Sequence, residues 1–232
     1  MEQQQDEQFD LNKMIEMSKT VAESIGCLDI NLLCEYLDQY VLMLKTLGKL
    51  VEIGFSDVST KAKILRENKE KLEAKGEDVS TIEKLMEKEV ELGLGKVNGS
   101  NNGKHKIPKS SEWYKHTGSC RTTERVLRFL LFVEGIMLNM YNKRDESLAI
   151  CIKNAYDKEL AAHHNFFLRG AVKGIVYLLP DRDSFLNSLT KNTGPLSEEA
   201  KYSLMNDVII NSQTLTSYLK EFMGERDLLN LD

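Results

Sequence analysis

Residues 117–142 read TGSCRTTERVLRFLLFVEGIMLNMYN, and this stretch decides the fold class. From residue 126 to residue 140, apolar side chains fall on nearly every side of a helix. The interruptions are Arg128, Glu134, Gly135 and Asn139. An apolar helix that is shorter than the roughly 20 residues needed to cross a bilayer is typical of the buried centre of a globular protein. The stretch therefore predicts one central core helix.

The rest of the chain carries helical periodicity rather than the alternation expected of strands. Its only prolines lie at positions 108, 180 and 195, so long stretches are free of the strongest helix breaker. Apolar residues recur three or four positions apart in predicted helices that span about 11–25, 29–54, 56–65, 78–90, 117–142, 147–160, 165–179 and 197–223. The sequence therefore predicts an all-α fold of about eight helices.

The length of the chain, 232 residues, suits a single domain. Residues 94–111 have the Gly, Asn, Ser and Pro content that is typical of a mobile loop. We interpret this segment as an insertion and not as a domain boundary. The expected organisation is a disordered N-terminal tail over residues 1–10 and one domain over residues 11–232, with the mobile insertion near 94–111.

The composition excludes several classes of protein. No apolar run approaches the length needed to span a bilayer. The chain begins MEQQQDEQ, without the basic and apolar regions of a secretory signal, so we expect a cytoplasmic protein. The four cysteines form no Cys-x-x-Cys pair and are expected to be free thiols. A formal net charge of −5 argues against general binding to nucleic acid.

Motifs for catalysis or metal binding are sparse. The sequence contains no GxSxG, no HExxH and no Gly-rich phosphate loop. The adjacent residues His163 and His164 would point about 100° apart on a helix, which is poorly suited to a shared metal. Cys120, beside Arg121, is the one thiol that an enzymatic interpretation could use. We therefore expect no metal, no cofactor and no catalysis.

Two pairs of charged residues are spaced to meet on a helix face. Arg121 and Arg125 lie four residues apart at the start of the core helix, where backbone N–H groups and the helix dipole also favour an anion such as phosphate. Asp57 and Lys61 share this spacing at the start of the helix predicted from residue 56. Each pair has a structural alternative, because such residues are commonly solvated ion pairs or surface charges.

Four segments, in this order and spacing, resemble the glycolipid transfer protein superfamily: DVSTK at 57–61, GSCRTTERVLR at 118–128, AY at 155–156 and HNFFLR at 164–169. Within the superfamily the pattern is most similar to the ceramide-1-phosphate transfer branch. The resemblance runs from about residue 30 to about residue 180. It implies a two-layer helical sandwich that encloses lipid chains in an apolar pocket and holds the headgroup at the surface. Such proteins move lipid between membranes without altering it.

The resemblance also implies a role for each candidate residue. Asp57 matches the carboxylate that accepts the sphingosine amide N–H, and Lys61 matches a nearby cationic ligand of the headgroup. His164 matches the imidazole that donates to the acyl carbonyl, so the amide would be recognised from both sides. Arg121 and Arg125 match the two arginines that grip the phosphate.

Position 125 separates two kinds of headgroup in this superfamily. Sugar-binding members carry a tryptophan there as a stacking platform, whereas this chain has Arg125. A guanidinium supplies forked hydrogen bonds to phosphate, so the sequence favours ceramide-1-phosphate as the ligand. A glycosphingolipid carrier, or a lipid sensor that binds without transfer, remain the alternatives. We expect a monomer that contacts membranes transiently and peripherally.

Two further features bear on the membrane and on the lipid chains. Phe166 occupies the place of a tryptophan that usually lies near the membrane in this superfamily, and the only tryptophan here is Trp113. Residues 96–116 hold five lysines against Glu112, a balance that could orient the protein on an anionic bilayer. The apolar pocket is expected between the helices spanning 32–54, 126–141 and 165–179. Candidate wall residues are Leu47, Phe55, Phe129, Phe132, Leu138, Phe167 and Val172.

Overall fold

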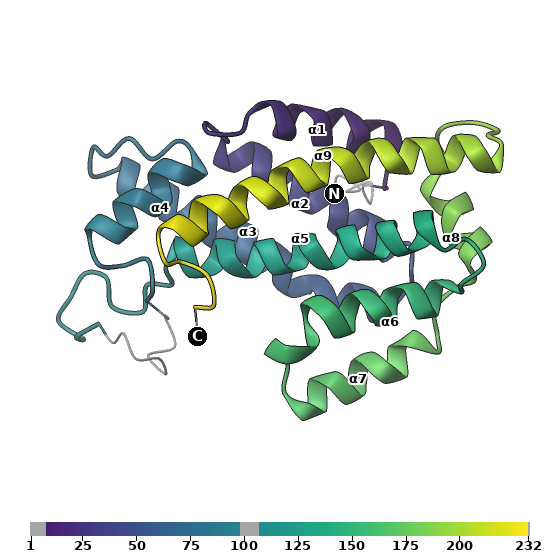
Figure 1. The fold of residues 1–232 in the computed structure, drawn as a ribbon. Coiled ribbons are helices and arrows are strands. Elements are labelled where there is room, and N and C mark those ends of the chain that lie inside the picture. Colours follow the sequence, from purple (N-terminus) through teal and green to yellow (C-terminus); the bar gives the residue numbers. More distant parts are fainter. Residues whose placement is uncertain (1–7, 98–106, 232) are drawn as a thin grey trace, which may run out of the picture.

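The structure, a computed structural model, describes residues 8–97 and 107–231, with side chains described throughout except at residues 49–56. Within these residues the chain forms nine α-helices and one 3₁₀ turn, η1 (Figure 1). They are α1 (Leu11–Glu23), α2 (Ile30–Lys45), α3 (Lys49–Glu73), α4 (Ile82–Glu91), α5 (Ser119–Asn142), α6 (Leu148–Glu159), η1 (Ala161–His163), α7 (Phe166–Val176), α8 (Arg182–Leu189) and α9 (Glu198–Glu225). The described part of the chain contains no strand, so the predicted all-α fold is confirmed.

The helices form two layers with α5 at the centre (Figure 1). In one layer α5 lies between α6 and α9. In the other layer α2 packs against α3, and α3 also contacts α5, while α1 contacts both α9 and α2. Along α5, Val126, Val133, Ile136 and Met140 are each at most 1% exposed. The helix is therefore the core element that its apolar sequence predicts.

The boundary of the second predicted helix, over residues 29–54, is wrong. Instead α2 ends at Lys45 and α3 begins at Lys49. Gly48, between them, has a φ of 114°, a conformation that favours glycine and that a helix cannot continue through. Apolar residues keep the helical period across this turn, so the pattern alone conceals it. Asp57 consequently lies in the interior of α3 and not in its first turn.

The short helix α8 was not predicted. The Asp181 side chain caps it by accepting a hydrogen bond from the Ser184 backbone N–H at 2.8 Å. Phe185, Leu186 and Leu189 are buried in the core. The helix has 8 residues, about two turns, which is too short for a periodic apolar pattern to be recognised.

The last residues of the predicted disordered tail over residues 1–10 pack against the fold. Phe9 is buried, and the amide of Asn192 donates to its carbonyl at 3.1 Å. Asp10 caps α1 by accepting from the Asn12 backbone N–H at 2.9 Å. The prediction for residues 1–7 falls outside the described residues.

The predicted insertion over residues 94–111 is described only at its two ends. Leu94 and Val97 are buried, with 5% and 3% of their surfaces exposed, so the first end packs against the fold. Residues 98–106, and with them the predicted basic contribution of Lys104 and Lys106, lie outside the described residues.

Candidate functional site

A cavity of about 650 Å³ lies where α3, α5, the η1–α7 junction and the chain after α9 come together. Its polar lining consists of Asp57, Lys61, Arg125, Arg128, His163, His164 and Asn230. Its apolar lining includes Phe129, Leu160, Leu168 and Leu231. The cavity therefore combines a cluster of cations with a hydrophobic wall, an arrangement that suits an amphipathic anion.

The α3 side of the cavity is an ion pair of unequal exposure. The Lys61 ammonium contacts the Asp57 carboxylate, and their side chains are 11% and 72% exposed. Burial lowers the pKa of Lys61, the Asp57 carboxylate opposes this, and the Arg125 guanidinium lowers it further. The pair is therefore not the solvated surface pair that its spacing alone would allow. An anion placed between Lys61 and Arg125 would stabilise both cations.

The α5 side of the cavity carries two arginines less than one turn apart. Arg125 and Arg128 both line it, and the Arg128 guanidinium forms an ion pair with Glu124. Burial raises the pKa of the Glu124 carboxyl, and the charge of Arg128 opposes that rise. The ion pair fixes Arg128 beside the cavity while leaving part of its guanidinium fork for a ligand.

Arg121, the other predicted phosphate ligand, does not line the cavity. It is buried, with 6% of its surface exposed, one turn before Arg125. Its backbone N–H donates to the Gly95 carbonyl at 3.2 Å, and the Ser119 backbone N–H donates to the Glu89 carboxylate. These two N–H groups are occupied within the protein, so they are not directed at an anion in the cavity, and a role of Arg121 in phosphate binding stays a prediction.

The last predicted residue, His164, faces the cavity from the η1–α7 junction. It is half-buried, and its Nδ1 atom lies 2.9 Å from the Tyr156 hydroxyl. Burial lowers the pKa of His164, with His163 and Lys61 acting in the same direction and Asp57 against it. A neutral ring whose Nδ1 accepts from Tyr156 has its Nε2–H available to donate to a ligand carbonyl.

The environment of His164 makes the stability of the protein depend on pH. Because its pKa is below the value of the unfolded chain, the unfolded state binds more protons as the pH falls through about 6.5. This contribution to stability is present above that pH and is lost below it. We expect the midpoint temperature of thermal unfolding to decrease when the pH is lowered from about 7.5 to about 5.5. The decrease should be smaller in His164→Gln, as measured by circular dichroism. An equal fall in both proteins would contradict this assignment.

The cavity lining also contains residues that the sequence analysis did not name as site residues: Val58, Arg128, Leu160, Ala162, His163, Leu168, Asn230 and Leu231. Arg128 follows Arg125 by three positions, so helical spacing alone could have placed it on the same face. The segment after α9 gave no such signal. It reaches the cavity because the chain turns back at Asp227, where φ is 52°, and runs beside the start of α5 (Figure 1).

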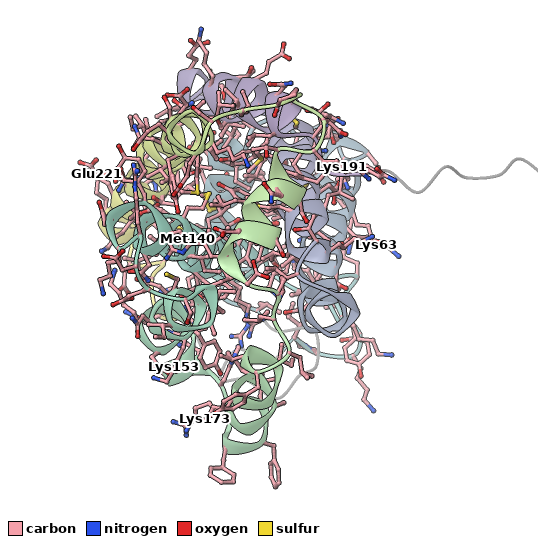
Figure 2. All side chains as sticks on the ribbon, turned by 90° about the vertical axis from the view of Figure 1, so that its right-hand side faces the viewer. Lys63, Met140, Lys153, Lys173, Lys191 and Glu221 are labelled. Atoms are coloured by element: carbon pink, nitrogen blue, oxygen red, sulfur yellow. The ribbon has the colours of Figure 1, made fainter. Side chains whose placement is uncertain are left out.

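Exposed aromatic and aliphatic side chains gather at α7. No residue of α7 is buried, and Phe166 and Phe167 are 78% and 84% exposed. Tyr177 and Leu178, just beyond the helix, are 88% and 66% exposed. Figure 2 shows α7, which carries Lys173, projecting from the bottom of the molecule. We call these four exposed residues the α7 patch. Phe167 is therefore not the pocket wall that the sequence predicts.

The other predicted wall residues differ in where they lie, and Leu138 and Val172 are half-buried against the core. Phe129 lines the cavity, whereas Phe132 is buried against Tyr156 with ring centroids 6.5 Å apart. Leu47 is buried in the core. Phe55 belongs to the segment of α3 whose side chains are not described.

Alternative chemistries find little support in the described residues. The Cys120 thiol is fully buried, and burial raises its pKa far above the ordinary value, so it is no nucleophile. No group of three potential metal ligands occurs in the part of the chain that the structure describes. In that same part, no helix combines the length and the apolar character required to cross a membrane.

A comparison with protein families shows to which family the chain belongs. The model of the family described as "Glycolipid transfer protein (GLTP)" matches residues 28–191. The chain belongs to the glycolipid transfer protein family. Among curated relatives in this family, ceramide-1-phosphate transfer protein of Rattus norvegicus is 30% identical over 122 residues, which cover 50% of this chain and 53% of the relative. The chain thus spans about half the length of the curated relatives it matches.

Solved structures of the family share the fold. Human ceramide-1-phosphate transfer protein in complex with 12:0 ceramide-1-phosphate has a TM-score of 0.76 at 19% identity, covering 97% of this chain and 100% of that one. A mutant of Arabidopsis ACD11 in complex with ceramide-1-phosphate has a TM-score of 0.72 at 21% identity, covering 94% and 96%. At these identities the likeness establishes the fold, and the choice of ligand must be argued from the side chains of the cavity.

Proposed function

We propose that this chain binds ceramide-1-phosphate in the cavity and transfers it between membranes without chemical change. The observation that carries the proposal is the convergence of Lys61, Arg125 and Arg128 on one cavity that also has a hydrophobic wall. The rat relative, which bears the name of a ceramide-1-phosphate transfer protein, supports the same ligand.

The charges of the cavity suit a phosphate better than a sugar. The lining contains three cations, Lys61, Arg125 and Arg128, and one carboxylate, that of Asp57. A phosphate monoester carries a charge of about −1.5 to −2 and accepts the forked hydrogen bonds of guanidinium groups. A glycosphingolipid is the second candidate, but Arg125 stands where a sugar would require a flat aromatic platform.

Both polar groups of the sphingolipid amide, its N–H and its carbonyl, can form a hydrogen bond to a residue of the cavity. Asp57, at the cavity edge, can accept from the amide N–H, and the Nε2–H of His164 can donate to the acyl carbonyl. A glycerolipid has esters in place of the amide and offers no N–H to Asp57. The pair therefore favours sphingolipids over glycerolipids that carry the same phosphate.

The hydrophobic wall of the cavity can shield lipid chains from water during transfer. Two lipid chains contain on the order of thirty methylenes, and exposing each to water costs about 0.8 kcal/mol. Phe129, Leu160 and Leu168 give the cavity of the headgroup residues an apolar surface. A protein that continues this surface around the chains removes most of that cost, so the barrier to transfer falls without any bond being broken.

The α7 patch is the proposed contact with the membrane. Replacing both Phe166 and Phe167 with serine should slow transfer between vesicles about 10-fold, because the insertion of two aromatic side chains into the bilayer is lost. Binding of a short-chain ceramide-1-phosphate in solution should not change. Ile210→Ser, at a residue 53% exposed on α9, is the control and should leave transfer unaffected. Unchanged transfer by the double variant would exclude the patch as the docking surface.

The function itself can be tested in two steps. Native mass spectrometry of the purified protein should detect a bound sphingolipid that carries phosphate. Transfer of labelled ceramide-1-phosphate between vesicles should then greatly exceed that of galactosylceramide. Equal transfer of both lipids would refute the headgroup assignment, and tight binding without transfer would identify a lipid sensor. A monomeric, cytoplasmic protein that docks peripherally is the form in which we expect this activity.

A further inference from the structure

Glu89, on α4, is a fully buried carboxylate outside the cavity. It accepts hydrogen bonds from the Ser119 backbone N–H and from the Ser119 hydroxyl, the latter at 2.8 Å. The His116 Nε2 atom lies at 3.0 Å and the Asn68 amide nitrogen at 3.2 Å. A carboxylate offers about four acceptor positions, and here four contacts surround it. Such a group is held firmly in place, and it does not line the cavity of the proposed lipid site.

Asn68, on α3, extends these contacts to the start of α5. Its amide nitrogen lies 2.8 Å from the Thr117 carbonyl oxygen and 2.9 Å from the Ser119 hydroxyl. Because Glu89 belongs to α4, the three helices α3, α4 and α5 are joined at one hydrogen-bonded point. We call Asn68, Glu89, His116 and Ser119 the Glu89 cluster.

Two of the joined helices supply the cations of the cavity. Lys61 precedes Asn68 by seven residues on α3, which is about two turns, so the two side chains project from similar faces. Arg125 follows Ser119 by six residues on α5. The Glu89 cluster therefore lies about 10 Å along each helix from the cavity, since each residue adds about 1.5 Å. A shift at the cluster would move the ammonium and the guanidinium relative to each other.

Close backbone packing beside the cluster also fixes the start of α5. A Cβ atom on Gly118 would lie 2.4 Å from the Gly95 carbonyl oxygen, closer than such atoms can approach. The Gly118 N–H donates to the Val97 carbonyl at 2.9 Å. The backbone contact and the Glu89 carboxylate together leave the first turn of α5 little freedom.

We infer that Glu89 is a positioning residue for headgroup recognition. Its carboxylate holds α3 and α5 at the spacing where Lys61 and Arg125 can bind one phosphate, although it touches no ligand itself. A carboxylate is suited to this task because it satisfies several donors at once and is favoured at a helix N-terminus. The inference rests on the proposed binding of a phosphate-bearing sphingolipid and adds the residue that sets the geometry of the two cations.

The test is Glu89→Gln, in which an NH₂ group replaces one oxygen and can no longer accept from Ser119. Glu83→Gln is the matched control. Glu83 lies on the same helix with 6% of its surface exposed, and it accepts from the Tyr218 hydroxyl at 3.0 Å, on α9. Both variants should lose thermal stability, but the Glu89 carboxylate contacts the helices that carry the cavity cations, α3 and α5, whereas the Glu83 carboxylate contacts α9.

The readout is the ratio of two dissociation constants measured by titration calorimetry. One is for a short-chain ceramide-1-phosphate, and the other is for the same ceramide without its phosphate. A general loss of folded protein affects both ligands equally and cancels in the ratio. Glu89→Gln should lower the preference for the phosphate about 10-fold, because misplaced cations lose charge-assisted hydrogen bonds, and Glu83→Gln should leave it within about twofold.

The outcomes separate this inference from the proposed function. A wild-type protein without preference for the phosphate would refute the proposed function. A wild-type preference that Glu89→Gln retains in full would overturn the positioning role. Should Glu89→Gln not fold, Ser119→Ala removes one donor and keeps the carboxylate. Ser119→Ala should lower the preference about threefold, and an unchanged preference in that variant would equally overturn the inference.

Discussion

Arg125→Ala is expected to lower the transfer of ceramide-1-phosphate about 100-fold while leaving the helical content unchanged. The residue is half-buried on α5, beside Lys61 and Arg128 at the cavity. Two charge-assisted hydrogen bonds to phosphate, at about 1.5 kcal/mol or more each, account for a factor of this size. The measurement is the transfer of a labelled lipid between vesicles, with far-ultraviolet circular dichroism as the check on folding.

Lys63→Ala provides a matched control for the loss of a positive charge. Lys63 lies on α3 two residues after Lys61, is exposed, and pairs with Glu67 at 3.6 Å outside the cavity. Its removal should leave transfer nearly unchanged, because an exposed pair of this kind contributes little. If Arg125→Ala kept more than about half of the wild-type transfer rate, the role of the guanidinium in phosphate binding would have to be abandoned.

The second large effect is expected at Asp57, in the discrimination between ceramide-1-phosphate and phosphatidic acid. Both lipids carry a phosphate monoester, but only the sphingolipid has an amide N–H. Asp57→Ala should lower the transfer of ceramide-1-phosphate by about 10- to 100-fold, as expected for the loss of one hydrogen bond to a charged acceptor. The transfer of phosphatidic acid should stay the same or rise, because removing the carboxylate also removes its repulsion of the phosphate.

The opposite responses of the two lipids make this experiment decisive for Asp57. The carboxylate also contacts Lys61, and its removal lets burial lower the pKa of that ammonium further. If Asp57 acted only by supporting Lys61, both lipids would lose transfer in equal proportion. That result would contradict recognition of the amide by Asp57.

The fold class was accessible from the sequence because the decisive helix is unusually apolar. Residues of α5 such as Val126 and Met140 are buried wherever the helical period repeats, and no alternative element fits so many apolar positions. The break at Gly48 was not accessible, because apolar residues keep their period on both sides of it and a glycine is also tolerated inside a helix. The helix α8 could not be predicted either, because its 8 residues are too few to show a periodic apolar pattern.

Most of the residues that the sequence predicts for the site lie at the cavity. Asp57, Lys61, Arg125 and His164 line one cavity although they lie on segments far apart in the sequence. Arg121 does not, because the first turn of α5 is buried against Gly95 and its neighbours. No local pattern reports this packing, which depends on a contact between two chain segments. In our proposal, Arg128 therefore takes the place of Arg121 in phosphate binding.

The electrostatics of the molecule are local rather than global. The whole chain has a formal net charge of −5, yet the polar side of the cavity has more cations than carboxylates. Buried or half-buried charges such as Lys61 are screened by salt less than exposed ones. An acidic protein can therefore bind an anionic lipid at one focused site without a general affinity for polyanions.

A crystal structure of the protein with a short-chain ceramide-1-phosphate would test the central claim most directly. We expect the phosphate within hydrogen-bonding distance of the Lys61 ammonium and of the Arg125 and Arg128 guanidinium groups, with the amide between Asp57 and His164. A phosphate bound away from these cations, or an amide that contacts neither Asp57 nor His164, would contradict it.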